Sequence, residues 1–469
     1  MNSKKKLFQN SIIYFIGNFA TKILAFFMLP LYTRYLSPTD YGEFDLAQSF
    51  TTLLYPIIFI QISDAVIRML LEAKGRDEQS KYISNAFLLL VLGTASSCAI
   101  LPFVAFSLNK SYLVLFYIYF VMHAWHTVIQ QIVRSLGYNK LYAFGGVIST
   151  LTTVALNLMF ILGFGYKAKA LFLSAIGTSF VLCFVMFFGA KLYRFISINS
   201  ISRKVIFEMV KYSIPLIPNT LSWQMITTFS RLYLGGVCGR DMQGLFAVVN
   251  RFPTLITMVT GIFYLAWQEI GITVYNTDEK DETYTDIYNL YINALFAGSV
   301  VLMPLSKVYI LYFLSNEYES VWVFIPIMII SAGISALNSF LGTAYLGKKN
   351  TKNIMYTSLI SGFVNVIIVL LLTKKLGIWG VAIGAFAANI VMLTIRTIDV
   401  KKYVQIKINK GVFIKNIVAL AFVYVLYYFT SGIVANILLT VVATIIGCIL
   451  AWPIISNVIS VFRRKIKNN

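Results

Sequence analysis

Apolar residues in this sequence come in long runs separated by short polar segments. Most runs are about 20 residues long, which is the length an α-helix needs to cross a bilayer. Such helices satisfy their backbone groups internally, so the pattern predicts an all-α polytopic membrane protein with about fourteen transmembrane helices. The predicted spans are 10–33, 44–66, 84–106, 112–133, 144–165, 171–192, 213–235, 245–268, 287–306, 322–345, 354–373, 378–396, 413–429 and 433–459.

Short motifs recur in the same order at an offset of about 200–210 residues. Because the repeated unit would hold an even number of spans, both copies run in the same direction, which predicts two pseudo-symmetric six-helix lobes around a central cavity plus two C-terminal helices. The predicted divisions are 1–195 (N-terminal lobe), 196–212 (cytoplasmic linker), 213–400 (C-terminal lobe) and 401–469 (two further helices and a basic tail). The matching pairs are Arg134–Lys140 with Ala344–Asn350, Asp40–Phe44 with Met242–Phe246, Asn157 with Asn365, Gly177 with Gly384, and Asn18 with Asn219.

Composition agrees with this pattern, and charge orients the chain. Hydrophobic residues make up 58% and charged residues 12%, and the mean hydropathy is +0.77. The net charge of +21 is unevenly spread, since most Lys and Arg fall in segments that lie on one side if the N-terminus is cytoplasmic. That asymmetry is the positive-inside rule, and it predicts that both termini lie in the cytoplasm. We therefore expect the basic charge to attract membrane lipids and expect no nucleic-acid partner.

The stretch LYTRYLSPTDYGEFDL, residues 31–46, joins the first two predicted spans. Ser37 is expected to cap a short helix with Pro38 at its first position and Asp40 at its third, as in a capping box. Gly42 is then expected to free the chain before the second span. Since the motif recurs at Met242–Phe246, we expect one such elbow at the outer rim of each lobe.

Three stretches together resemble the polysaccharide-biosynthesis flippases, the oligosaccharide-lipid exporters of the multidrug/oligosaccharidyl-lipid/polysaccharide superfamily. They are TRYLSPTDYGEF, KYSIPLIPNTLSW and LTKKLGIWGVAIGAFAANI. The resemblance implies a transporter rather than an enzyme. Its cargo would be an undecaprenyl-(pyro)phosphate-linked oligosaccharide, moved from the inner to the outer leaflet of the bacterial cytoplasmic membrane by alternating access. That step would serve O-antigen, capsule or exopolysaccharide synthesis.

Several alternatives remain open beside that interpretation. They are a flippase for lipid II or a teichoic-acid precursor, a related drug exporter, and a membrane-embedded polymerase or transferase. The implied partners are the lipid-linked oligosaccharide, membrane lipids, and a polysaccharide polymerase with glycosyltransferases. No cofactor is expected, and coupling to Na⁺ or H⁺ is left open.

Cations at membrane depth are costly, so they are the first candidates for binding a lipid phosphate. Lys22 lies about eleven residues into the first span, near the bilayer midplane. Arg231 and Arg251 lie in the outer halves of the seventh and eighth spans, and an Arg fork can bond two phosphate oxygens. The resemblance also implies cationic cavity linings on spans 1, 7 and 8. Arg34 is a further candidate at the outer rim.

A polar stripe on the fourth span contains both histidines of the chain. His123, His126 and Gln130 share one helical face with Thr127, and they are candidates for sugar binding, proton coupling or helix–helix hydrogen bonding. No Cys or carboxylate has the spacing to complete a metal site with them. Asn18 and Asn219 are candidates either for sugar binding or for joining helices.

Two acidic features complete the set of candidates. Asp64 and Arg68 are spaced i, i+4 near the inner end of the second span, which predicts a structural or gating salt bridge. The acidic stretch Thr277–Asp286 is expected to be a solvated cytoplasmic loop, since it lacks a surrounding nucleotide-binding fold.

Overall fold

The computed structural model describes residues 26–100, 102, 104, 108–348 and 351–467, and every regular element in this part of the chain is a helix. The candidates Asn18 and Lys22 lie outside the described residues. By contact, the chain divides at Gly244 into two compact units, which are described separately below. The lobes predicted from the repeat, 1–195 and 213–400, stay a prediction.

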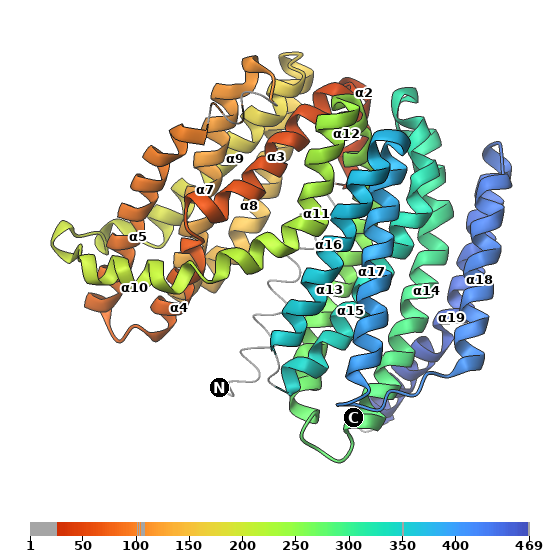
Figure 1. The fold of residues 1–469 in the computed structure, drawn as a ribbon. Helices are drawn as coiled ribbons and strands as arrows, with labels where there is room; N and C mark the ends of the chain where they lie inside the picture. The colour runs from red at the N-terminus through yellow and green to blue at the C-terminus, as the bar shows by residue number, and fades with distance from the viewer. Residues whose placement is uncertain (1–25, 101, 103, 105–107, 349–350, 468–469) are drawn as a thin grey trace. The chain divides into compact units, whose positions relative to one another are not determined.

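The described part of the first unit contains ten α-helices besides short 3-10 and π segments, and the last α-helix continues into the second unit (Figure 1). They are α2 (Leu29–Tyr35), α3 (Pro38–Ile58), α4 (Ile62–Glu72), α5 (Arg76–Ser97), α7 (Leu113–Ser135), α8 (Asn139–Leu158), α9 (Ala168–Gly189), α10 (Arg203–Ser213), α11 (Leu216–Cys238) and α12 (Arg240–Val249).

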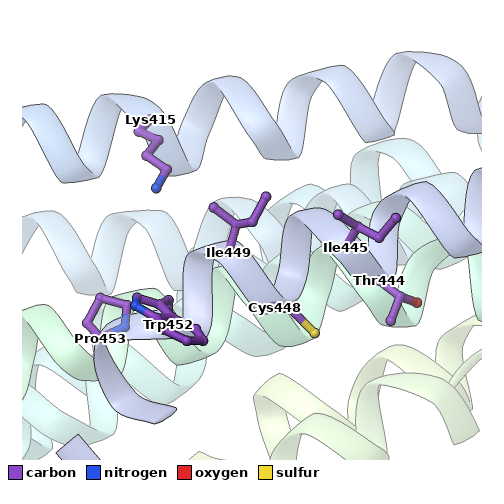
Figure 2. Close-up of a pocket in the computed structure, with 7 residues that line it drawn as sticks. All are labelled: Lys415, Thr444, Ile445, Cys448, Ile449, Trp452 and Pro453. Atoms are coloured by element: carbon purple, nitrogen blue, oxygen red, sulfur yellow. The ribbon is translucent and has the colours of Figure 1, made fainter. Parts of the chain in front are cut away.

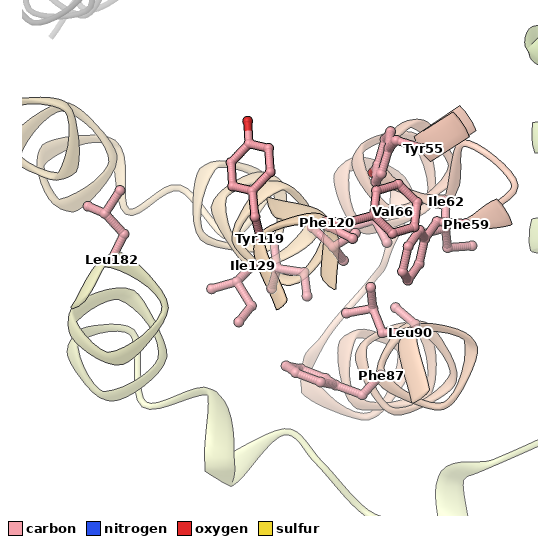
Figure 3. Packing of buried hydrophobic residues seen from close by; sticks show 14 of the residues in the cluster. Tyr55, Phe59, Ile62, Val66, Phe87, Leu90, Tyr119, Phe120, Ile129 and Leu182 are labelled. Atoms are coloured by element: carbon pink, nitrogen blue, oxygen red, sulfur yellow. The ribbon is translucent and has the colours of Figure 1, made fainter. Parts of the chain in front are cut away.

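The core of the first unit is aromatic and aliphatic. Figure 3 shows Phe59, Phe87 and Phe120 among its members, contributed by the α3–α4 connection, α5 and α7. Phe59 and Phe120 have their ring centroids 5.5 Å apart. A Cβ on Gly93 of α5 would lie 2.6 Å from the Phe59 ring, so the absence of a side chain there is what lets α5 approach the connection.

The second unit contains seven further α-helices and one long 3-10 segment within the described residues. They are α13 (Arg251–Val274), α14 (Lys280–Phe313), η6 (Asn316–Phe324), α15 (Ile325–Gly347), α16 (Thr351–Leu376), α17 (Ile378–Val400), α18 (Lys410–Phe429) and α19 (Ile433–Lys467). The acidic stretch Thr277–Asp286, expected to be a loop, instead forms the first turns of α14 from Lys280 onward. Its Asp281 and Glu282 sit where a helix dipole favours negative charge.

Ten helices of the described residues are long and apolar enough to cross a membrane, or eleven if one bent pair is a single span. The chain is therefore a multi-pass membrane protein, whereas the predicted number of fourteen spans is not confirmed. The bent pair is α3 and α4, which meet at 55°. Ile60 and Gln61 adopt left-handed backbone angles between them, so the chain over the predicted span 44–66 is broken into two helices.

A connecting segment in each unit is tied to a helix by the same arrangement of hydrogen bonds; the first of these segments includes a short 3-10 turn, Ile198–Ser200. We call residues 195–202 the first strap and residues 405–409 the second strap. In the first, the Ser84 hydroxyl of α5 donates to the Phe195 carbonyl at 3.2 Å and accepts from the Ser197 N–H at 2.9 Å. In the second, the Thr285 hydroxyl of α14 donates to the Gln405 carbonyl at 3.3 Å and accepts from the Lys407 N–H at 3.1 Å.

An asparagine completes each strap in the same way. Asn85 Nδ2 donates to the Ser200 carbonyl at 3.0 Å, and its Oδ1 accepts from the Ser202 N–H at 3.0 Å. Asn289 Nδ2 donates to the Lys407 carbonyl at 2.9 Å, and its Oδ1 accepts from the Asn409 N–H at 3.1 Å. Both Nδ2 groups also reach the carbonyl one turn earlier on their own helix. The two straps thus repeat at an offset close to that of the sequence motifs.

Candidate functional site

The start of α3 is fixed by the capping box that the sequence predicts. Ser37 Oγ accepts from the Asp40 N–H at 3.2 Å, and Asp40 Oδ2 accepts from the Ser37 N–H at 3.3 Å, with Pro38 at the first helical position. The helix that begins here is not short, because α3 continues to Ile58. The box therefore sets the direction in which the acidic side chains of the first two turns project.

Gly42 has a different role from the one predicted. It lies inside α3, where a Cβ would come 2.1 Å from the Arg240 carbonyl oxygen, and a Cβ on Gly244 would come 1.8 Å from the Pro38 carbonyl oxygen. The two glycines of the repeated motif thus face each other and allow the backbones of α3 and α12 to touch. No other residue type would fit this approach.

Around these glycines, charged and amide side chains join three helices. We call the set Glu43 and Asp45 of α3, Arg231 of α11, and Arg240 and Gln243 of α12 the clasp. Its ion pairs join Arg231 Nη1 to Asp45 Oδ1 at 3.3 Å and Arg240 Nε to Glu43 Oε1 at 3.6 Å. Gln243 Nε2 donates to Asp45 Oδ2 at 3.3 Å, so both oxygens of Asp45 are bonded.

The clasp is shielded from solvent, but incompletely. Glu43 and Asp45 are buried, and Gln243 is fully buried, whereas 31% of the Arg231 side chain is exposed. Arg240 Nη1 also donates to the Gly235 carbonyl at 3.0 Å and to Gln243 Oε1 at 3.3 Å. At the rim, the Thr39 hydroxyl donates to the Asp241 carboxylate. Each buried acid therefore has a cation or an amide partner, as burial of charge requires.

Of the three predicted cations that lie in the described part of the chain, the structure brings only Arg231 into the clasp. Its guanidinium charge is balanced by Asp45, a partner that was not predicted. Arg34 lies exposed in α2, and Arg251 is the first residue of α13, where it is half-buried. Arg240, which the sequence analysis did not single out, holds the second acid of the clasp. The signal for these pairs was present, since two acids follow the capping box on α3, and Arg231 and Arg240 both precede the repeated motif at Met242–Phe246.

The polar stripe on α7 lies against aromatic rings. The His123 ring is 5.9 Å from the Tyr55 ring, edge-on, and 6.1 Å from the Tyr119 ring. His126 Nε2 is buried and has no hydrogen-bond partner among the described residues, and Gln130 is half-buried. Asn219 lies in α11, and its side chain is outside the described part. The stripe thus belongs to the packed interior of the first unit, with an unmet polar atom at His126.

The predicted pair Asp64–Arg68 is wrong. Arg68 instead pairs with Glu72, from Nη2 to Oε1 at 2.6 Å, and Asp64 Oδ2 accepts from Gln61 Nε2 at 3.1 Å. Each partner lies within about one helical turn of the residue that it bonds. The helix break at Gln61 brings the Gln61 amide close to Asp64. Among the described residues, no group of three or more His, Cys, Asp or Glu side chains could hold a metal ion.

The second unit holds a buried cation that the sequence analysis missed. The Arg396 guanidinium of α17 donates to the Asn338 carbonyl at 2.6 Å, to the Thr357 hydroxyl at 3.0 Å and to the Ser358 hydroxyl at 3.2 Å. Neutral oxygens on α15 and α16 thus bond all three of its nitrogens. Arg396 joins three helices of this unit, and we assign it a structural role.

A family model described as "Polysaccharide biosynthesis protein" matches residues 7–267. No curated protein sequence matches the chain. Among solved structures, the fold is similar to that of the lipid II flippase MurJ in an inward closed conformation, with a TM-score of 0.69 and 17% identity over 95% of this chain and 100% of that one.

Two transporters of the MOP superfamily also share the fold. An inward-facing multidrug resistance transporter of the MATE family gives a TM-score of 0.65 and 13% identity, covering 81% of this chain and 95% of that one. A transporter from Pyrococcus furiosus, whose binding pocket is described as having reverse polarity, gives 0.58 and 14%, covering 86% and 97%. At these identities the likeness concerns the fold alone.

Proposed function

Because this chain belongs to the polysaccharide biosynthesis protein family, we propose that it is a flippase for an undecaprenyl-(pyro)phosphate-linked oligosaccharide. It would move this lipid from the inner to the outer leaflet of the bacterial cytoplasmic membrane. The observation that carries the proposal is the family match over residues 7–267, in a chain folded like a lipid flippase and like transporters. The product would serve a cell-surface polysaccharide such as O-antigen or capsule.

The clasp supports a mechanism of alternating access. It joins α3 to α11 and α12 through two ion pairs at the predicted outer rim, so opening that rim requires both pairs to separate. Separation would free Arg231 from Asp45, and a free guanidinium can bond two phosphate oxygens of the cargo. Phosphate and Asp45 would thus compete for the same cation, so that binding of the cargo favours the open clasp.

The direction of transport fits an anionic headgroup. With the cell interior negative, each negative charge that moves fully outward gains roughly 2.3 kcal/mol per 100 mV. Glycosyltransferases on the cytoplasmic side would supply the lipid, and a polymerase on the outer side would consume it. In this arrangement both termini lie in the cytoplasm. Coupling to Na⁺ or H⁺ would add to the same driving force.

The test is translocation by the purified chain in proteoliposomes. A fluorescent undecaprenyl-pyrophosphate oligosaccharide is placed in one leaflet, and its appearance in the other is followed with a membrane-impermeant quencher. We expect Lys22→Ala and Arg231→Ala each to lower the rate at least about tenfold, since each removes a proposed phosphate contact. The exposed Lys110→Ala is the matched control and should leave the rate unchanged. Normal translocation by both cavity variants would contradict the cationic cavity.

Lipid II or a teichoic-acid precursor is the second candidate cargo, favoured by the likeness in fold to MurJ. The same assay separates the candidates when each lipid competes with the labelled oligosaccharide. Stronger competition by lipid II than by the unlabelled oligosaccharide lipid would assign the chain to that cargo. Uptake of a cationic drug without translocation of any lipid would instead assign it to drug export.

A further inference from the structure

A cavity of about 490 Å³ opens on the surface of the second unit between α18 and α19. Figure 2 shows Lys415 of α18 reaching toward Ile449 and Trp452 of α19, with Ile445 further along the same helix. Apart from Lys415, the lining is mainly apolar. The side chains of Ile449 and Trp452 are 53% and 62% exposed, so this face is open to the bilayer.

Lys415 places a positive charge on a surface that lipid should cover. It lies five residues after the start of α18, which is about 7.5 Å along the helix axis. Its neighbours Ile414 and Val418 are exposed apolar residues, as expected of a lipid-facing helix. A cation in this position is stabilised only when an anion or the water of the headgroup layer is within reach.

The part of the sequence that forms α18 and α19 contains no acidic side chain. No Asp or Glu follows Asp399 in the sequence, although nine Lys and Arg do. None of the ion pairs among the described residues includes Lys415. The buried hydrogen bond of the next residue, from Asn416 Nδ2 to Asn293 Oδ1 at 2.6 Å, fixes the opposite face of α18 on α14.

The far end of α18 is held as well, so the groove has fixed walls. Lys307 Nζ donates to the carbonyls of Tyr427 at 2.5 Å and Thr430 at 2.7 Å. The same ammonium group lies 4.2 Å from the centre of the Trp322 ring. Leu450 and Ala443 of α19 are buried in the cluster that α14 and α18 complete. These contacts hold α18 on α14 and so fix the backbone position of Lys415 beside the groove.

We propose that the groove between α18 and α19 binds an anionic glycerophospholipid of the inner leaflet. Its phosphate contacts Lys415, and one acyl chain lies along α19 between Ile445 and Trp452. Because the groove is open to the bilayer, its occupant exchanges with the bulk lipid, where glycerophospholipids are the abundant anions. The indole of Trp452 fits the headgroup level, where tryptophan is enriched. This inference is independent of the proposed cargo, since it requires only that the chain spans a membrane with the start of α18 on the cytoplasmic side.

The test is lipid retention by the full chain, measured by native mass spectrometry in detergent after titration with phosphatidylglycerol. We expect Lys415→Ala to lower its retention about fivefold, the effect of one lysine near a lipid phosphate. Lys410→Ala, at the start of the same helix, is the matched control and should retain the lipid like the unmodified chain. Lys415→Arg should retain it too, and Trp452→Ala should lower retention without changing the preference over phosphatidylethanolamine.

Three results would overturn the proposal. Equal retention by Lys415→Ala and the unmodified chain would show that no phosphate is bound there, as would an equal loss in Lys410→Ala. Displacement of phosphatidylglycerol by an equal concentration of undecaprenyl phosphate would assign the groove to the transported lipid instead. Because Lys415 is exposed, these variants are expected to fold, and their unfolding temperatures provide the check.

Discussion

The clasp and the two straps both hold segments together, but by different chemistry. In the clasp, charged and amide side chains of α3, α11 and α12 meet one another around two facing glycines. In the straps, neutral hydroxyl and amide side chains of α5 and α14 bond backbone groups of a connecting segment. The comparison indicates that the clasp can open and close, whereas the hydrogen bonds of the straps remain formed.

The reason is the difference in the free-energy cost of breaking the two kinds of contact. The ion pairs of the clasp are only partly shielded, since 31% of the Arg231 side chain is exposed, so water can solvate the separated charges and offset part of the cost of parting them. A backbone group of the part-buried first strap that loses its partner is left poorly satisfied, at up to about 1–3 kcal/mol for each group, whereas water can reach the backbone groups of the exposed second strap. We therefore expect the clasp to part during transport while the straps keep their segments fixed to α5 and α14.

The largest loss of stability is expected where the backbones of α3 and α12 touch at Gly42 and Gly244. Gly244→Val would place side-chain atoms against the Pro38 backbone, so α3 and α12 must separate or the fold must distort. We expect a loss of roughly 3 kcal/mol in the free energy of unfolding, measured by thermal or denaturant unfolding in detergent. Gly236→Ala on α11 is the matched control, because nothing lies within 4 Å of its Cβ position. Equal stability of the two variants would show that the glycine contact is absent.

A smaller effect is expected from each strap, and it should differ between them. Asn85→Leu and Asn289→Leu each remove two hydrogen bonds to a strap, and Asn85 is fully buried whereas Asn289 is only half-buried. We expect losses of about 2–3 kcal/mol for Asn85→Leu and about 1 kcal/mol for Asn289→Leu, since water can replace the lost partners more easily at Asn289.

Hydrogen exchange at the N–H groups of Ser202 and Asn409 measures the straps directly. We expect each N–H to lose protection only in the variant of its own strap. Thr283→Val, on the same helix as Asn289, is a control without a strap contact. Unchanged protection of both N–H groups would contradict the account of the straps.

Charge removal in the clasp should affect conformation more than stability. Asp45→Asn leaves Arg231 without its ionic partner, and we expect a loss of about 1 kcal/mol that shrinks at high salt. Spin labels at positions 39 and 241 should show a broader distance distribution in this variant. The exposed Asp286→Asn on α14 keeps the clasp intact and should match the unmodified chain. An unchanged distribution in Asp45→Asn would mean that the ion pair does not hold the clasp closed.

The smallest effect is expected at the surface pair Arg68–Glu72. Both side chains are more than half exposed, at 57% and 60%, so Arg68→Gln should change the free energy of unfolding by less than about 0.5 kcal/mol. Translocation by this variant should be normal. A loss of transport without a loss of stability would restore a gating role for Arg68.

Much of the fold follows from local sequence. The apolar runs predicted helices over nearly all of the described chain, and the residues Ser37, Pro38 and Asp40 predicted the capping box that starts α3. These features depend on neighbouring residues, so a single sequence is enough to predict them. The bend at Ile60 and Gln61 was missed because neither residue type favours left-handed backbone angles.

The partners of side chains were harder to predict. Arg231 was expected to be a cavity cation, whereas its carboxylate partner Asp45 lies 186 residues earlier and meets it only in the folded chain. Arg68 had acids at both i−4 and i+4, and spacing alone could not choose between Asp64 and Glu72. The straps were not predicted because Ser84 and Thr285 bond backbone groups. Every residue has such groups, so the sequence does not indicate which of them will be bonded.

The central claim is that this chain moves a lipid-linked oligosaccharide and that the clasp must open for it to do so. It is tested by translocation of undecaprenyl-pyrophosphate oligosaccharide through a chain carrying Thr39→Cys and Asp241→Cys, with the native cysteines replaced. The two positions are in hydrogen-bonding contact, so a disulfide there locks the clasp shut. We predict transport by the reduced protein and a loss of at least about tenfold on oxidation, reversed by reductant. Equal transport in both states, or no transport of this lipid by the reduced protein, would contradict the account.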